Sequence, residues 1–240
     1  MSALVSVLAA LGTAGGIGMA LSPLPTMKTI VSTKSIGEYS VFPYVVTFCQ
    51  CGLWMTYATL TPGKGALIPV NVFIFCIELA YVGIFLKYAT PDVRHKLWGT
   101  IGYVCGLTAG AIILALITPA TSAFVGFFAV ISNIIMYAAP LGVVKTVIET
   151  RSVQYMPFLL SLAGTISSFI WTCWALAARD PFVLLPNVLG FVLGVIQLVV
   201  YFKFKNADSA AASYYSPNAI VAEPVLSPTT AESESKILIK

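Results

Sequence analysis

The chain carries two copies of one apolar unit, offset by 117 residues. The segment Ser22–Ile36 returns as Ala139–Val153, and Leu53–Ala58 returns as Ile170–Ala175 in the same register. A duplicated hydrophobic unit predicts two related halves that enclose one site, an arrangement typical of membrane transporters.

Hydrophobic stretches dominate the chain, in which 58% of the residues are hydrophobic and 9% are charged. The apolar runs cover about 4–24, 41–61, 66–88, 98–117, 123–144, 156–178 and 182–204. Each has about 20 residues, the length that a helix needs to cross a bilayer. The runs are continuous rather than alternating, which favours helices over a β-barrel. The first run is too long for the core of a signal peptide, so we count it as a span. We therefore expect an all-α membrane protein with seven transmembrane helices.

Basic residues concentrate on one side of the expected spans. Nine follow spans one, three, five and seven, namely Lys28, Lys34, Lys87, Arg94, Lys96, Lys145, Arg151, Lys203 and Lys205. Only Lys64 and Arg179 lie near the opposite ends. Because cytoplasmic loops carry an excess of Lys and Arg, we expect the N-terminus outside or in a lumen and the C-terminus in the cytosol. We favour the plasma membrane, keep an organelle membrane as the alternative, and expect no nucleic-acid partner.

The orientation of the two copies requires a linker span. Three spans enter on one side and leave on the other, so an odd connecting span lets the second copy repeat the orientation of the first. We expect two parallel three-helix repeats (3+1+3), with residues 1–89 and 121–205 as the repeats and 90–120 as the linker helix. Residues 206–240 are rich in Ala, Ser, Pro, Thr and Glu, which predicts a disordered cytosolic tail.

No residue pattern predicts a metal or a cofactor. The five cysteines all fall inside expected spans without the spacing of a metal site, and we expect them to pack as small apolar residues without disulfides. The single histidine, His95, is expected in a solvated loop.

Two asparagines occupy corresponding places in the third span of each copy. Asn71 follows Pro69-Val70, and Asn187 follows Leu185-Pro186, with a one-residue shift in register. An amide inside a membrane span is costly unless it is satisfied, so both should face the interior. Asn offers donors and acceptors without charge, which suits the hydroxyl groups of a neutral solute. The alternative is an interhelical hydrogen bond that holds the bundle together.

Two tryptophans, Trp54 and Trp171, correspond in the second span of each copy. An indole can cover the apolar face of a sugar ring while the hydroxyls turn to the asparagines. The alternative is a pair of interfacial anchors. Gln50 and Ser167 lie one helical turn before each Trp and share its face.

Lys64 and Asp180 each lie seven residues before the Asn of their copy. We expect them at the outer mouth, where they could form an ion pair above Tyr57; two independent solvated charges are the alternative. Glu78 is the one carboxylate deep inside a span. We prefer a structural role for Glu78 at a helix contact over a proton site, because Asn holds the places where a coupled carrier needs a carboxylate.

The residues resemble the SWEET family of sugar facilitators over about residues 4–205. The resemblance rests on Leu21–Thr26, Lys34–Gly37, Trp54 with Tyr57, Asn71 with Glu78, Val153–Phe158 and Pro186–Gly190 through Gln197. It implies that Met19, Met136, Gly16 and Asn133, at positions i−4 and i−7 from Pro23 and Pro140, line the same pocket as the Asn and Trp pairs. It also implies that four prolines are pivots beside an inner gate, namely Pro23, Pro43, Pro140 and Pro157.

The chain departs from the family pattern at two positions. The family has a small residue where Gln50 stands and a Tyr where Trp174 stands. With two long Met side chains, Gln50 narrows the expected pocket, which favours a monosaccharide over a disaccharide.

The expected function is bidirectional, energy-independent transport of a small sugar by alternating access, with a hexose favoured over sucrose. We expect no enzymatic activity, and the bilayer and the sugar as partners, with a homo-oligomer left open. The alternative is a proton-coupled exporter of amino acids or other solutes of the PQ-loop kind, against which the absence of a Pro-Gln dipeptide counts. A seven-helix receptor is disfavoured because receptors lack parallel internal repeats.

Overall fold

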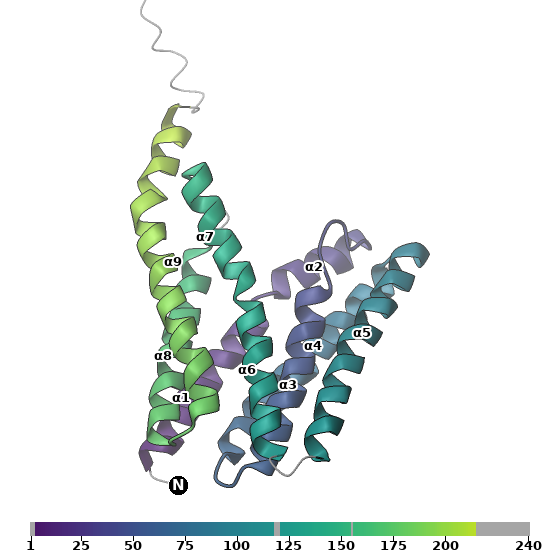
Figure 1. The fold of residues 1–240 in the computed structure, drawn as a ribbon. Helices are drawn as coiled ribbons and strands as arrows, with labels where there is room; N and C mark the ends of the chain where they lie inside the picture. Colours follow the sequence, from purple (N-terminus) through teal and green to yellow (C-terminus); the bar gives the residue numbers. More distant parts are fainter. Residues whose placement is uncertain (1–2, 118–120, 155, 215–240) are drawn as a thin grey trace, which may run out of the picture.

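The computed structural model describes residues 3–117, 121–154 and 156–214, with side chains as far as Lys205. The described chain is helical (Figure 1). The last helix continues to Tyr214, past Lys205, where we expected the disordered tail to begin. The rest of that expected tail, residues 215–240, lies outside the described residues.

Each expected repeat consists of three spans, and the first span of each repeat is broken into two helices. The first repeat contains α1 (Ala3–Leu21), α2 (Leu24–Thr33), α3 (Phe42–Leu60), the short 3-10 helix η1 (Gly65–Leu67) and α4 (Ile68–Tyr88). The second contains α6 (Thr121–Met136), α7 (Ala138–Thr150), α8 (Phe158–Ala177) and α9 (Pro181–Tyr214). Between them lies the linker α5 (Pro91–Leu116). Because α5 begins at Pro91, His95 is exposed on a helix and not in the loop that we expected.

Six helical stretches are long and apolar enough to cross a membrane. The remaining expected span, α3, is 19 residues long but more polar, because it contains Thr47, Gln50 and Thr56. It packs against α4, α5 and α6, which places it inside the bundle. Large apolar side chains such as Leu107 and Ile117 are exposed on the outer surface, as expected where lipid is the solvent. The chain is an integral membrane protein of seven spans.

The two repeats pack in the same internal order. In each, the third span lies between the other two: α4 contacts α1 and α3, and α9 contacts α6 and α8. The repeats meet through reciprocal contacts, α1 with α8 and α3 with α6, as a two-fold relation requires. The linker α5 packs on α3 and α6. A site enclosed by the two halves is therefore built by corresponding helices from each.

Prolines interrupt the first span of each repeat. Pro23 lies between α1 and α2, and Pro140 lies in the first turn of α7, just after the α6–α7 break. Pro43 lies in the first turn of α3, and Pro157 is the N-cap of α8. Pro43 and Pro157 therefore interrupt no helix, because the amides of a first turn have no intrahelical partner to lose. The role of the four prolines as pivots stays a prediction.

Candidate functional site

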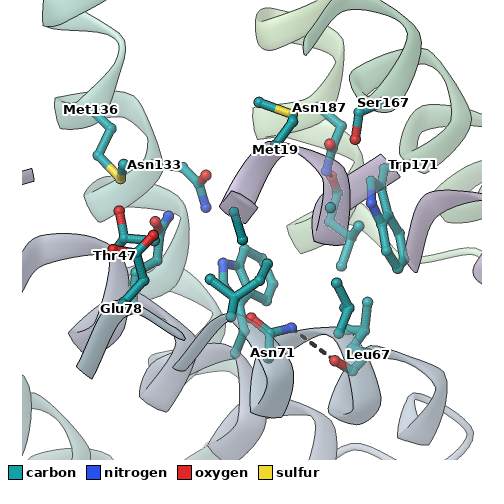
Figure 2. Close-up of a pocket in the computed structure, with 17 residues that line it drawn as sticks. Met19, Thr47, Leu67, Asn71, Glu78, Asn133, Met136, Ser167, Trp171 and Asn187 are labelled. Carbon is teal, nitrogen blue, oxygen red and sulfur yellow. Dashed lines mark hydrogen bonds between the residues drawn. The ribbon is translucent and has the colours of Figure 1, made fainter. Parts of the chain in front are cut away.

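A cavity of about 390 Å³ lies between the two repeats. This volume falls within the range of about 300–1,000 Å³ that is typical of small-molecule sites. Its walls come from α1, α3 and α4 on one side and from α6, α8 and α9 on the other (Figure 2). The structure brings all ten residues that we expected to contact a solute to this cavity: Gly16, Met19, Gln50, Trp54, Asn71, Asn133, Met136, Ser167, Trp171 and Asn187.

The asparagines adopt one conformation in both halves. Asn71 donates from Nδ2 to the carbonyl oxygen of Leu67 at 2.8 Å, and Asn187 donates to that of Val183 at 2.7 Å. Each bond uses one N–H of the amide, so a second N–H and the lone pairs of Oδ1 are left to meet a ligand. Figure 2 shows Oδ1 of Asn71 turned away from Leu67. The bonds to the helix backbone hold both amides in place.

Each cavity tryptophan packs against an aromatic residue one turn further along its helix. Trp54 meets Tyr57 edge to face with ring centroids 5.8 Å apart, and Trp171 meets Trp174 at 5.6 Å. Trp171 is also held by α1, because a Cβ on Gly12 would lie 2.7 Å from its Cε2 atom. The indoles are therefore positioned before any ligand arrives.

Close helix packing defines the remaining wall. A Cβ on Gly16 would lie 2.8 Å from Cγ2 of Val70, so the glycine lets α1 approach α4. Met19 and Met136 extend from corresponding positions of α1 and α6.

Several wall residues were missing from the expected site. They are Ala20, Thr47, Leu67, Val70, Ile74, Glu78 and Val183. Glu78 corrects the sequence reasoning, which assumed that no carboxylate lines the solute route. It follows Asn71 on α4 by two helical turns, and this spacing places both on one helix face. That spacing was the signal that could have identified it.

A second cavity of about 520 Å³ continues from the first within the second repeat. The two share Met19, Asn133, Ser167 and Asn187. The second cavity reaches Pro140 and Pro157. We call the end of the bundle that holds these prolines the open end, and Figure 1 shows α7 and α9 diverging from α2 and α4 toward it.

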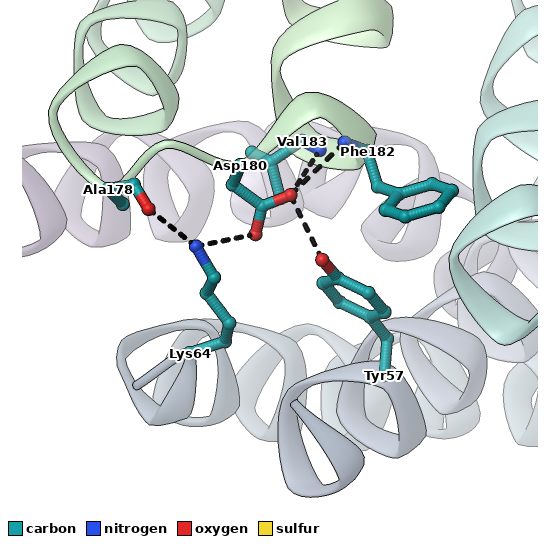
Figure 3. Close-up of polar contacts among 6 residues, drawn as sticks. All are labelled: Tyr57, Lys64, Ala178, Asp180, Phe182 and Val183. Atoms are coloured by element: carbon teal, nitrogen blue, oxygen red, sulfur yellow. Dashed lines mark hydrogen bonds and ion pairs between the residues drawn. The ribbon is translucent and has the colours of Figure 1, made fainter. Parts of the chain in front are cut away.

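The opposite end is closed by contacts between the repeats (Figure 3). Lys64 Nζ lies 3.3 Å from Asp180 Oδ2 and donates to the carbonyl oxygen of Ala178 at 2.7 Å. Tyr57 donates from Oη to Asp180 Oδ1 at 3.0 Å. The ion pair that we considered for Lys64 and Asp180 is therefore formed, with Tyr57 beside it. We call this end of the bundle, which Lys64, Asp180 and Tyr57 hold together, the closed end.

Asp180 is the centre of the closed end. Its side chain is fully buried, and that of Lys64 is 11% exposed. Oδ1 also accepts from the backbone N–H groups of Phe182 and Val183, both at 3.1 Å, so the carboxylate caps the first turn of α9. A buried carboxylate needs such partners, because an unpaired charge away from water is strongly unfavourable.

Lys64 meets the second repeat at a further point, since its Nζ lies 5.7 Å from the ring centroid of Trp174. Trp174 corresponds to Tyr57 in the repeat. The closed end is thus asymmetric, with a phenol that donates to Asp180 on one side and an indole under an ammonium on the other.

Within the described residues, no cluster of three His, Cys, Asp or Glu side chains could hold a metal ion. The five cysteines are free, and Cys49 and Cys105 place their Sγ atoms 3.6 Å apart.

Comparison with known proteins gives the family. A family model described as "Sugar efflux transporter for intercellular exchange" matches residues 6–92 and again residues 123–209. The two matches are offset by the same 117 residues as the internal repeat. The chain belongs to the SWEET family.

Individual SWEET proteins match most of the chain. The bidirectional sugar transporter SWEET5 of Arabidopsis thaliana is 36% identical over 207 residues, which are 83% of this chain and 85% of the relative. SWEET16 of the same plant is 38% identical over 196 residues, with 78% and 84% covered. A solved structure of a eukaryotic SWEET transporter superimposes with a TM-score of 0.76 at 30% identity, covering 85% of this chain and 100% of that one. The family comprises transporters and not enzymes.

Proposed function

We propose that this chain carries a small sugar across a membrane by alternating access, in both directions and without an energy source. One observation carries the proposal: the cavity between the repeats presents a matched pair of amides and a matched pair of indoles. Uncharged donors and acceptors suit hydroxyl groups, and indole faces suit the C–H face of a sugar ring.

Alternating access needs one end of the cavity closed while the other is open. The contacts among Tyr57, Lys64 and Asp180 join the two repeats at one end, and the cavities extend toward the prolines at the other. The opposite state would need these three contacts to break while the repeats rock about the bound solute. Pro23 and Pro140 are the sites where we expect the first span of each repeat to bend.

We further propose that a hexose is preferred to sucrose. Met19 and Met136 project into a cavity of about 390 Å³ that two indoles already limit. This volume is the space that these side chains leave between them, and we expect it to hold one ring more readily than two.

The orientation follows from the charge count. The nine basic residues of the sequence analysis include Lys28 on α2, Lys87 at the end of α4 and Lys145 on α7, which belong to the open end. We propose that this end faces the cytosol, that the N-terminus lies outside, and that the protein resides in the plasma membrane. A tag at each terminus, probed with antibody before and after permeabilisation, tests on which side each terminus lies and whether the protein reaches the cell surface.

Radiotracer uptake in cells that lack their own hexose carriers tests the function. Glucose should enter faster than sucrose, preloaded glucose should exit as readily as it enters, and a protonophore should change neither rate. If surface-delivered protein moves no sugar in either direction, the proposal is wrong.

A second function has one observation in its favour. Glu78 lies on the cavity wall, where a proton-coupled exporter of amino acids or other solutes would need a carboxylate. Accumulation of solute above the outside concentration, abolished when the pH gradient collapses, would support this rival over passive transport.

A further inference from the structure

Two polar atoms of the cavity wall lack a hydrogen-bond partner among the described residues. They are Nε2 of Gln50 and Oε2 of Glu78. Gln50 is 8% exposed and Glu78 is 6% exposed, and both line the central cavity. Buried polar groups are normally paired, so each such atom requires an explanation.

No positive charge on the cavity wall compensates Glu78. Among the described lining residues there is no Lys, Arg or His. Tyr44, Cys51 and Tyr81 lie near Glu78, and none of them carries a positive charge. The Tyr81 hydroxyl already donates to the carbonyl oxygen of Ala20 at 2.9 Å. A structural partner, as expected from the sequence, is therefore missing for Oε2.

The two unpartnered atoms are chemically complementary to one kind of ligand group. Nε2 of Gln50 is a donor and Oε2 of Glu78 is an acceptor, and a hydroxyl group both accepts and donates. Thr47 lies three residues before Gln50 on the same face of α3. Its hydroxyl donates to the carbonyl oxygen of Pro43 at 2.9 Å and can still accept. Figure 2 shows Thr47 beside Glu78.

We propose that Gln50 and Glu78, with Thr47 beside them, form a hydroxyl-binding subsite that fixes the orientation of the sugar. This inference rests on the proposed transport of a sugar and adds which residues read its hydroxyls. Glu78 lies two helical turns beyond Asn71, a rise of about 10 Å along α4. One pyranose ring with its hydroxyl groups is shorter than this rise, so a single sugar fits alongside α4 between the two levels.

The subsite belongs to the first repeat alone. By the repeat register, Gly194 corresponds to Glu78 and Ser167 corresponds to Gln50. A Cβ on Gly194 would overlap Oγ1 of Thr165, so no side chain can occupy that place without displacing α8. Among the described lining residues of the central cavity, only the first repeat therefore supplies a carboxylate, and a bound sugar would have one preferred direction.

Competition with monodeoxyglucoses tests the subsite. Each analogue lacks one hydroxyl, and its inhibition constant against glucose uptake is measured for the parent chain, Glu78→Gln and Gln50→Leu. One analogue lacks the hydroxyl from which Glu78 accepts a hydrogen bond. In the parent chain, its inhibition constant should be about tenfold higher or more. At that same ring position, Gln50→Leu should lose most of this penalty. Glu78→Gln should lose part of it, because the Gln carbonyl still accepts a hydrogen bond but carries no charge. The penalties at other positions should persist.

Val70→Ala is the matched control, because it alters an apolar part of the same wall. It should change the inhibition constants of all analogues by a similar factor. The subsite is overturned if both variants show the same dependence of the inhibition constant on ring position as the parent. It is also overturned if Glu78→Gln and Gln50→Leu lose the penalty at different ring positions. If the parent moves no sugar at all, the proposed function fails and not merely the subsite. Proton-driven accumulation that is lost in Glu78→Gln, with an unchanged analogue pattern, also counts against it.

Discussion

Replacing Tyr57 with Phe isolates one contact that holds the closed end together. The substitution removes only the hydroxyl that donates to Asp180 Oδ1 at 3.0 Å. The ring keeps its packing against Trp54 and Phe182, and Asp180 keeps the two backbone donors at the start of α9. A hydrogen bond to a charged group contributes about 1.5–3 kcal/mol. Its loss should raise the population that is open at this end by about 10- to 150-fold, at 1.36 kcal/mol per decade.

A Val70→Cys substitution reports that population. Val70 is buried on the cavity wall, and the five native cysteines can be replaced in the same background. The rate at which a membrane-impermeant maleimide labels the introduced thiol from the Tyr57 side should rise in Tyr57→Phe by the factor above. Tyr81→Phe is the matched control, since its hydroxyl bonds to Ala20 within the first repeat. Labelling rates of Tyr57→Phe within about twofold of the parent would refute the role of this bond.

Three further predictions concern the cavity. Asn71→Ala and Asn187→Ala should each abolish most sugar uptake at unchanged surface delivery, since each removes hydrogen bonds of about 1–3 kcal/mol; normal uptake by both would exclude the amides as ligands. Met19→Val with Met136→Val should raise sucrose uptake relative to glucose, and an unchanged ratio would show that these side chains do not limit ligand size. Gly12→Ala should reduce glucose uptake and thermal stability, because the added methyl group would overlap Trp171, at a cost of about 1–3 kcal/mol. Gly18→Ala is the control, because a Cβ at this position would have no atom within 4 Å, and it should behave like the parent.

The sequence predicted the broad architecture because the relevant signals are local. Hydrophobic length determines which segments span a bilayer, and an odd linker span follows from topology alone. These arguments led to the all-α, seven-span fold with two parallel repeats, which the SWEET structure with a TM-score of 0.76 confirms. The repeat and helical periodicity pointed to the Asn and Trp pairs with Gln50 and Ser167, and the family resemblance added Gly16, Met19, Asn133 and Met136. All ten line one cavity. Their roles in binding and gating stay predictions.

Local reasoning was less successful where a residue's role depends on its neighbours. Proline always lacks an N–H, but the consequence depends on where the helix starts: Pro23 lies at a break and Pro43 lies in a first turn. Likewise, α9 continues beyond Lys205, although composition predicted a tail from residue 206.

Glu78 marks most clearly what the sequence left open. A carboxylate in a span is notable in any sequence, but whether it faces a helix contact or a cavity depends on the packing of α3 and α4. The Lys64–Asp180 pair is similar, because the two residues are 116 positions apart and meet only when the repeats close. The sequence by itself determined the spans, the repeat and the residues that correspond between halves, since these follow from hydrophobicity and register. Only the tertiary structure decided which polar atoms are paired across the halves and which are left facing the cavity, because pairing depends on distances between separate helices.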